Sequence, residues 1–266
     1  MKSFKQQYGK WALVAGAAEG IGKAFSVILA RQGQHLVMVD HHAEALTDLT
    51  SEIEGKYGVK TISLCLDLAG ENAPGKCMEA IQNLDCRMMI YVPAFSKVRS
   101  FLSNSQEDLD RFIHLNCRAP MQLVHAFASH IEGRGPGGII LMSSLAGLIG
   151  PQFVAPYAGT RAFNIVLAEA LFHEFSAKSI DILACCAGIT STPTYLASLP
   201  DKAANIPGIL DAETVAAFAL HQLGKKAICI PGWKNRFSYF ILTRILSRKQ
   251  ASALVSKAMR KMYPGK

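Results

Sequence analysis

Three residues, Ser144, Tyr157 and Arg161, have the types and the spacing to protonate a carbonyl oxygen during hydride transfer. Ser144 follows an apolar, strand-like run, Tyr157 comes thirteen residues later, and Arg161 comes four residues after the tyrosine. Positions i and i+4 share one face of a helix, so the Arg161 guanidinium can reach the Tyr157 phenol. A free phenol has a pKa of about 10, and a fixed neighbouring cation favours its ionised form. Taken alone, such a pair more often merely shares a helix face.

Apolar segments of strand length alternate with longer amphipathic segments along the chain. Continuous apolar strands separated by helices favour a parallel sheet covered on both faces. The predicted strands are Trp11–Ala15, His35–Val39, Thr61–Leu66, Met88–Val92, Gly138–Met142, Asp181–Cys185 and Ala227–Ile230. Amphipathic segments include Ala43–Glu54, Gln106–Ile131 and Ala155–Ala177. We therefore predict one doubly wound α/β domain over residues 1–233, with a lid at about 190–213 and a separate C-terminal extension at 234–266.

The composition indicates a chain with a large buried core. Of its 266 residues, 50% are hydrophobic and 18% are charged. No apolar run reaches the roughly 18 residues that span a bilayer, and the first residues lack the apolar segment of a signal peptide, so we expect a cytoplasmic protein. The seven cysteines form no Cys-x-x-Cys pair and have no matching histidine spacing. Neither a disulfide framework nor a metal site is predicted.

The first predicted strand runs into a glycine-rich turn with the residues Gly16, Gly20, Ile21 and Gly22, and a helix-like segment follows. Glycines permit a tight turn, and they let backbone N–H groups and a helix N-terminus approach a pyrophosphate. The place of this turn, after the first strand of a βαβ unit, predicts a dinucleotide site.

Two acids follow the next two predicted strands. Asp40, eighteen residues after Gly22, can accept hydrogen bonds from the adenosine ribose hydroxyls and would repel a 2′-phosphate. Since no lysine or arginine lies beside it in residues 40–44, we favour NAD over NADP; the alternative is a simple helix cap before Ala43. Asp67 can contact the adenine edge or cap the next turn, and the sequence does not separate these two roles.

Assembled in order, these residues resemble the short-chain dehydrogenase/reductase family over about residues 8–235. The resemblance rests on the glycine turn, the acid after the second strand, Asp67-Leu68, Asn116, the spacing from Ser144 to Tyr157, and Gly188 followed by Thr192. It implies a Rossmann-type sheet and hydride transfer between a nicotinamide cofactor and an alcohol or carbonyl compound. It also implies a homodimer or homotetramer formed through the long helices near 106–131 and 155–177.

The resemblance assigns roles by matching position. Tyr157 would be the general acid in reduction and the base in oxidation, and Ser144 would stabilise charge on the substrate oxygen. Asn116 would hold a water that connects the site to bulk solvent, or would be a structural asparagine in a helix kink. Thr190 and Thr192 would approach the nicotinamide carboxamide and the diphosphate. The other positions matched to the cofactor are Leu68, Ala94, Tyr157, Arg161 and Gly188.

The sequence also departs from the family pattern. Arg161 stands where a lysine is usual; it keeps the charge and can bond the nicotinamide ribose, but it cannot readily release a proton. We therefore predict retained but slowed chemistry. Val92-Pro93-Ala94-Phe95 replaces the usual Asn-Asn-Ala-Gly, and Pro93 lacks a backbone donor, so cofactor affinity is expected to fall. Ala15 and Ala187 replace a threonine and a proline.

Apolar residues after Ser144 and in the lid predict the substrate side of the site. They are Leu145, Leu148, Ile149, Phe153, Val154, Tyr195, Leu196 and Leu199. This pattern favours a hydrophobic ketone or secondary alcohol, or an acyl thioester. The alternative is that about half of these side chains pack in the core or at a subunit interface.

The net charge of +8 is concentrated at the C-terminus. From Lys234 onward there are nine lysines and arginines and no acid, while the preceding 233 residues carry 19 bases and 20 acids. This distribution argues against a nucleic-acid-binding protein. The basic, partly apolar extension fits an anionic membrane surface, a phosphate-bearing partner such as an acyl thioester or acidic carrier, or a solvated helical pair over the pocket or a neighbouring subunit.

Three functions therefore remain open at the level of the sequence. The first is an NAD-dependent oxidoreductase for an apolar alcohol or carbonyl compound, which the presence of Ser144, Tyr157 and Asn116 favours. The second is a catalytically weak nucleotide-binding or regulatory protein, which Arg161 and the Val92–Phe95 segment favour. The third, a membrane-surface scaffold, rests on the C-terminal extension alone.

Overall fold

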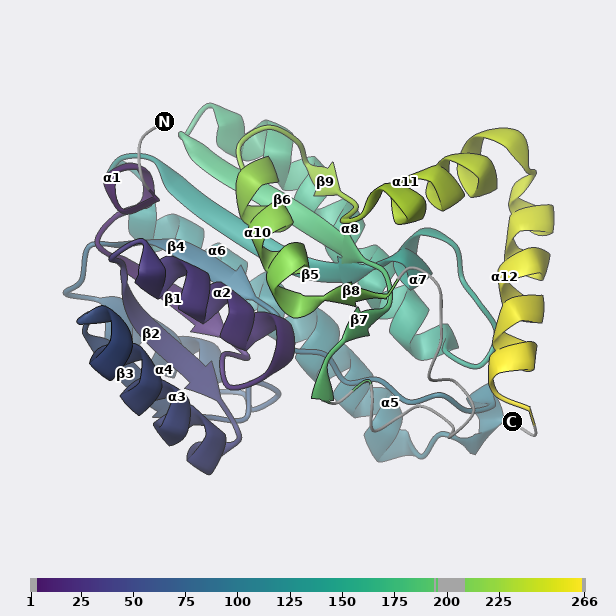
Figure 1. Cartoon of the computed structure of the whole chain (residues 1–266), viewed down its shortest axis with the longest axis horizontal. Helices are drawn as coiled ribbons and strands as arrows, with labels where there is room; N and C mark the ends of the chain where they lie inside the picture. Colours follow the sequence, from purple (N-terminus) through teal and green to yellow (C-terminus); the bar gives the residue numbers. More distant parts are fainter. Residues whose placement is uncertain (1–3, 194, 196–208, 265–266) are drawn as a thin grey trace.

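A seven-stranded parallel sheet forms the centre of the molecule, with the strand order β3-β2-β1-β4-β5-β6-β9 (Figure 1). The computed structural model describes residues 4–193, 195 and 209–264. The strands of the sheet are β1 (Trp11–Ala15), β2 (His35–Asp40), β3 (Thr61–Cys65), β4 (Cys86–Tyr91), β5 (Gly137–Ser144), β6 (Ile180–Ala187) and β9 (Ile228–Cys229). The short strands β7 (Thr190–Ser191) and β8 (Leu210–Asp211) form a separate parallel pair.

Helices cover both faces of the sheet, which confirms the predicted doubly wound α/β fold. In Figure 1, α2 and α10 lie in front of the sheet, and α6 and α8 lie behind it. The helices are α1 (Phe4–Tyr8), α2 (Gly20–Arg31), α3 (Ala43–Tyr57), α4 (Ala73–Ile81), α5 (Gln106–Ile113), α6 (Ala119–Ile131), α7 (Leu145–Leu148), α8 (Ala155–Ser176), α10 (Ala212–Gln222), α11 (Trp233–Phe240) and α12 (Arg248–Met262).

Alternation along the strands divides the interior into two apolar cores. In β1, Ala12 and Val14 belong to the core beneath α2, α3 and α10, whereas Leu13 and Ala15 belong to the core beneath α4, α6 and α8. Successive side chains of a strand point to opposite faces, so a strand buried on both faces has to be apolar throughout. This is why the central strands read as continuous apolar runs.

The chain reverses its direction of travel across the sheet at β1, which pairs with β2 on one side and β4 on the other. In open α/β sheets, a crevice forms beyond the carboxyl ends of the strands at such a switch point. The glycine turn after β1 and the segment after β4 therefore face each other across this crevice.

The prediction of one continuous helix over Gln106–Ile131 is wrong in one respect. A π-helical segment, His114–Arg118, separates α5 from α6. Pro120 has no N–H to donate to the carbonyl of Asn116, four residues earlier. That carbonyl instead accepts a hydrogen bond of 3.0 Å from Asn164 Nδ2 on α8. The wider π-helical turn, with its i→i+5 hydrogen bonds, accommodates this interruption between α5 and α6.

The C-terminal extension is helical. After α11 the chain forms a π-helical segment at Ile241–Ile245, and α12 begins at a capping box in which Ser247 and Gln250 bond each other's backbone N–H groups. Hydrogen bonds tie α12 to the 150–152 loop, including Ser252 Oγ to Gly150 O at 3.1 Å and Arg260 Nη1 to Gln152 Oε1 at 2.7 Å. Among the described helices, none is both long and apolar enough to cross a bilayer.

Candidate active site

A cleft of about 930 Å³ lies at the carboxyl ends of β1, β4, β5 and β6. It brings together most of the residues that the sequence singled out, from segments spread over more than 170 positions of the chain. The predicted residues that line it are Gly16, Gly20, Ile21, Asp40, Asp67, Leu68, Ala94, Ser144, Tyr157, Arg161, Gly188, Thr190 and Thr192. Gly22 and Asn116 lie behind the wall instead, and both are buried.

The glycine turn is shaped to receive an anion. Gly16 and Gly20 have φ values of +75° and +53°, in the left-handed region that glycine adopts without strain. A Cβ at Gly22 would collide with the carbonyl of Gly16, so only glycine lets α2 pack this close to the turn. The side chain of Glu19, the residue before α2, makes no capping hydrogen bond to that helix. The N–H groups of the first turn of α2 are therefore available to a pyrophosphate.

Asp40 is fixed at the end of β2 by backbone donors. Its Oδ2 accepts from Ala18 N at 2.9 Å, and its Oδ1 accepts from His41 N at 2.8 Å and His42 N at 3.2 Å. The residue that precedes α3 as its cap is His42, so Asp40 does not cap that helix. Asp40 instead places a buried carboxylate beside the glycine turn, where it ties the turn to the β2–α3 loop.

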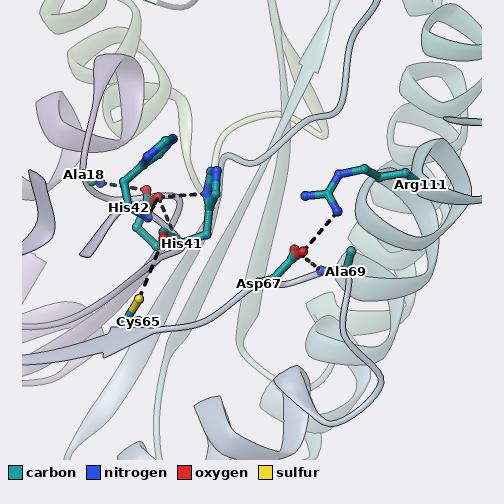
Figure 2. A network of polar contacts seen from close by, with 8 residues as sticks. Ala18, His41, His42, Cys65, Asp67, Ala69 and Arg111 are labelled. Carbon is teal, nitrogen blue, oxygen red and sulfur yellow. Dashed lines mark hydrogen bonds and ion pairs between the residues drawn. The ribbon is translucent and has the colours of Figure 1, made fainter. Parts of the chain in front are cut away.

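Asp67 is held between Arg111 and the backbone N–H of Ala69, as Figure 2 shows. Its Oδ1 accepts from Ala69 N at 3.0 Å and its Oδ2 from Arg111 Nη1 at 3.0 Å. Partial burial raises the pKa of the Asp67 carboxyl, but these hydrogen bonds outweigh it and hold the pKa below its usual range. Asp67 thus stabilises its own turn while it lines the cleft.

Ser144 and Tyr157 are brought together by the close packing of α7 against α8, which Gly147 permits. Ser144 ends β5 and its Oγ accepts from Ala146 N at 3.2 Å in the first turn of α7, while Tyr157 lies in the first turn of α8. A Cβ at Gly147 would approach Arg161 C and Ala162 N to 2.7 Å. Glycine at position 147 therefore allows α7 to pack against α8, a contribution that the sequence analysis did not identify.

Arg161 is almost fully buried, and two backbone carbonyls hold its guanidinium. Nη1 donates to Met142 O at 2.8 Å and Nη2 to Pro93 O at 3.4 Å, which joins the ends of β5 and β4. The guanidinium carbon lies 5.1 Å from the centre of the Tyr157 ring, so the cation faces the ring. Among the contacts of the described residues, none is a hydrogen bond from Arg161 to the Tyr157 hydroxyl.

The backbone of Arg161 is anchored as well. Ser143 Oγ donates to Arg161 O at 2.8 Å, which fixes this turn of α8 against the end of β5. Ser143 was not among the predicted site residues, although it directly precedes the predicted serine. Both Ser143 and Ser144 line the cleft, and Ser143 also bonds the backbone of α8.

Asn116 connects three parts of the site from behind. Its Oδ1 accepts from Phe95 N at 2.7 Å, and its Nδ2 donates to Phe95 O at 2.9 Å and to Thr160 Oγ1 at 3.0 Å. Both side-chain polar groups of Asn116 are thus occupied by the segment after β4 and by α8. This geometry supports the structural alternative for Asn116, and the predicted water site remains a prediction.

Replacing Asn116 with alanine is expected to destabilise the fold. The change leaves both backbone groups of the half-buried Phe95 without their side-chain partner, and an unsatisfied group shielded from water costs about 1–3 kcal/mol. We expect the free energy of unfolding to fall by about 3 kcal/mol, measured by urea denaturation. The matched control is Asn72→Ala, because Asn72 is exposed and its side chain makes no capping hydrogen bond. A loss equal to that of the control would contradict this account.

The apolar wall of the cleft is only partly the predicted one. Val154 and Tyr195 line it, whereas Leu145 and Leu148 pack against the core and Ile149 is buried. Leu196, Leu199 and most of the predicted lid lie outside the described residues. The remaining apolar wall comes from Pro151 and from the C-terminal segment, through Met259, Met262 and Tyr263. Burial raises the pKa of Tyr195 to about 12, and nearby Tyr263 acts in the same direction.

Two cations that sequence reasoning missed also line the cleft, on the segment after β4. Lys97 Nζ lies 2.6 Å from Asp108 Oδ1, and Arg99 Nη1 lies 2.9 Å from Asp108 Oδ2. The hydrogen bond from Lys97 holds the pKa of the Asp108 carboxyl below its usual range. The carboxylate of Asp108 therefore anchors both side chains at the rim.

The site fits a nicotinamide dinucleotide. The open N-terminus of α2 and the close approach at Gly22 suit a pyrophosphate. At the other end of the cleft, Arg161 Nε is buried and has no hydrogen-bond partner among the described residues. A buried donor in that state calls for an acceptor, and a ribose hydroxyl oxygen supplies one.

Comparison with known proteins agrees with this geometry. A family model described as short chain dehydrogenase matches residues 10–202. A 7beta-hydroxysteroid dehydrogenase of Clostridium sardiniense is 30% identical over 234 residues, which are 88% of this chain and 90% of that protein. A very-long-chain 3-oxoacyl-CoA reductase of Aspergillus oryzae is 31% identical over 212 residues, covering 76% of this chain and 61% of that one.

Solved structures show the same likeness. A structure from a study of 7beta-hydroxysteroid dehydrogenase stereoselectivity superposes with a TM-score of 0.88 at 27% identity, covering 96% of this chain and 99% of that chain. The glycine turn, the Ser144–Tyr157–Arg161 arrangement and the family match over most of the chain lead to one conclusion. The chain belongs to the short-chain dehydrogenase/reductase family and is an NAD(P)-dependent oxidoreductase acting on CH–OH groups.

Proposed function

We propose that this enzyme uses NAD(H) and interconverts a bulky, hydrophobic secondary alcohol and its ketone. The observation that carries the proposal is the single cleft, in which Ser144, Tyr157 and Arg161 lie between a dinucleotide-shaped turn and an apolar wall. Proteins similar to this chain, a 7beta-hydroxysteroid dehydrogenase and a very-long-chain 3-oxoacyl-CoA reductase, are named for large, apolar substrates.

The protein's contribution to the reaction follows from the positions of its side chains. The nicotinamide cofactor supplies or accepts the hydride. In reduction, the Tyr157 hydroxyl donates its proton to the carbonyl oxygen, and in oxidation the phenolate takes a proton from the alcohol. Ser144 Oγ, held by Ala146 N, directs its own hydrogen toward the same oxygen and stabilises the charge that develops there.

Arg161 stabilises the reacting tyrosine without passing on its proton. Its buried guanidinium lies over the Tyr157 ring and places a positive charge beside the reacting side chain. Because the guanidinium stays protonated and its two Nη groups are held by carbonyls, the proton that Tyr157 loses has to be replaced by another route. Water and the cofactor ribose are the groups left to supply that route.

The preference for NAD rests on the charge beside the glycine turn. Glu19 and Asp40 both line this end of the cleft, and Asp40 is locked in place by three backbone donors. Two carboxylates would repel a 2′-phosphate, while the Asp40 carboxylate can still accept from ribose hydroxyls through its remaining lone pairs.

Replacing Asp40 with asparagine should weaken this selectivity. The change keeps an oxygen acceptor for Ala18 N–H or His41 N–H but removes the negative charge, whose repulsion of a phosphate is on the order of 1–4 kcal/mol near a protein surface. We expect the ratio of the NADPH to the NADH dissociation constants to fall by about tenfold or more. Fluorescence titration with NADH and with NADPH measures this ratio. Glu44→Gln, an exposed acid at the start of α3 outside the cleft, is the matched control, and an equal effect there would refute the local role of Asp40.

The substrate class can be tested by direct competition. Steroid ketones and 3-oxoacyl thioesters are offered together with NADH, and the reduced products are identified by mass spectrometry. We expect the steroid ketone to be reduced preferentially, because the wall of Val154, Tyr195 and Met262 presents apolar groups to a bulky ring system. Preferential reduction of the thioester would show that the bulky part of the substrate is an acyl chain.

We also propose that residues 1–233 form the catalytic domain and that the enzyme is a homodimer or homotetramer. Exposed apolar side chains on α5, α6 and α8 support the assembly, namely Ile113, Met121 and Val166. These helices are the ones through which the family resemblance implies subunit contact. Light scattering of the purified protein measures the assembly directly.

A further inference from the structure

The segment that follows the last strand of the sheet carries a row of exposed apolar side chains. Trp233, Phe237 and Phe240 are 68%, 61% and 54% exposed, and their spacing of four and three residues places them on one face of α11. Ile245, which ends the following π-helical segment, is 62% exposed. We call these four residues the aromatic stripe. Side chains of this size are usually covered, and the described part of the chain leaves them uncovered.

Cations accompany the aromatic stripe. Lys234 Nζ lies 5.7 Å from the centre of the Trp233 ring, and Arg244 and Arg248 are exposed at the far end of the stripe. From Lys234 onward the chain has nine bases and no acid, while the rest of it carries nearly equal numbers of both. The charge of this segment is therefore complementary to an anionic partner.

We propose that the aromatic stripe docks on the anionic surface of a lipid bilayer. A helix with Trp and Phe on one face and Lys or Arg beside them lies in the headgroup region, where its rings enter the acyl boundary and its cations meet lipid phosphates. Figure 1 shows α11 leading away from β9 and α12 at the outer edge of the molecule, so the segment projects from the sheet. Since no described helix can cross a bilayer, the contact is peripheral.

A second copy of the chain is the other candidate occupant, and its charge disfavours it. A two-fold interface through the aromatic stripe would bring each stripe against its own counterpart. The flanking cations of both copies would then meet, and the segment from Lys234 onward contains no acid to neutralise them. An anionic lipid surface satisfies both the apolar and the charged parts of this segment.

The test uses a reporter that the chain already contains. The protein has two tryptophans, Trp11 and Trp233. Trp11 is partly covered in β1, where it contacts His35. Trp11→Phe therefore leaves the Trp233 indole as the only tryptophan signal. We expect its emission to shift to shorter wavelength with vesicles of phosphatidylcholine and phosphatidylglycerol, and to remain unchanged with phosphatidylcholine alone.

Variants in the Trp11→Phe background separate the apolar and charged contributions. Phe237→Ser should lower the vesicle partition coefficient at least tenfold, because it removes one aromatic ring that the bilayer would bury. Arg244→Gln with Arg248→Gln should weaken it about 25-fold, about fivefold per charge. Phe101→Ser removes an aromatic side chain with similar exposure, 55%, from outside the C-terminal segment and should leave partition unchanged.

The oligomeric state of the same samples distinguishes membrane docking from an interface between two copies of the chain. One outcome is that the parent protein fails to bind anionic vesicles while Phe237→Ser dissociates its oligomer. That result would identify the aromatic stripe as an interface between copies and would show that the proposal is wrong. Equal binding to neutral and anionic vesicles would likewise overturn it, since the cations would then have no part. None of these readouts uses catalytic activity, so failure of the proposed reaction would leave the test intact.

Discussion

Replacing Tyr157 with phenylalanine should lower kcat by about 10²–10⁴-fold, the usual contribution of a positioned general acid. The ring and its contact with the Arg161 guanidinium remain, and only the hydroxyl of this cleft-lining residue is lost. Since no described contact of the fold uses that hydroxyl, the melting temperature and the dissociation constant for NADH should change little. The loss should therefore appear in turnover alone.

Steady-state kinetics with NADH and a reducible ketone measures this effect, with NADH affinity determined separately by fluorescence titration. Tyr239→Phe is the matched control, because Tyr239 is half-buried and lies outside the cleft. A kcat for Tyr157→Phe within a few-fold of the parent enzyme would show that another group protonates the substrate.

Substitutions at Arg161 should separate its charge from its shape. Arg161→Met removes the cation and leaves the Met142 and Pro93 carbonyls without their donor, so kcat/KM should fall by about 10²-fold or more. Arg161→Lys keeps a cation and restores a group that can exchange its proton. We expect its kcat to rise about threefold or more.

The Arg161→Lys variant should also have a lower free energy of unfolding than the parent protein, which gives a second, independent measurement. A lysine ammonium cannot reproduce the planar fork that reaches from Met142 O to Pro93 O, and one buried carbonyl left unpaired costs roughly 1–3 kcal/mol. Thermal unfolding measures this cost in the same samples as kcat. An unchanged or lower kcat for Arg161→Lys would show that arginine does not slow the proton relay.

The sheet and the catalytic arrangement were predictable because their signals are local. Strands buried on both faces require unbroken apolar runs, so each of the seven was found within a few residues of its observed bounds. Ser144, Tyr157 and Arg161 lie within eighteen residues of one another on a strand end and one helix. Because the spacing along one helix fixes which side chains share a face, the relative positions of Tyr157 and Arg161 could be predicted.

The missed features depend on backbone groups and distant segments. Arg161 binds the carbonyls of Met142 and Pro93, and any residue type supplies a carbonyl, so the sequence carries no sign of that bridge. Met259 and Met262 reach the cleft only because α12 is tied to the 150–152 loop. The break at Asn116, by contrast, had a readable signal in Pro120, four residues later.

Transfer of a labelled hydride from NADH to a ketone would demonstrate the oxidoreductase activity of this protein. NADH that carries deuterium at its transferable position is incubated with the enzyme and a panel of steroid ketones and 3-oxoacyl thioesters, and the products are examined by mass spectrometry. We expect one deuterium on the new carbinol carbon of at least one product, and we expect this label to disappear with Tyr157→Phe. Tight NADH binding without label in any product would contradict it and favour a nucleotide-binding protein that has kept the fold.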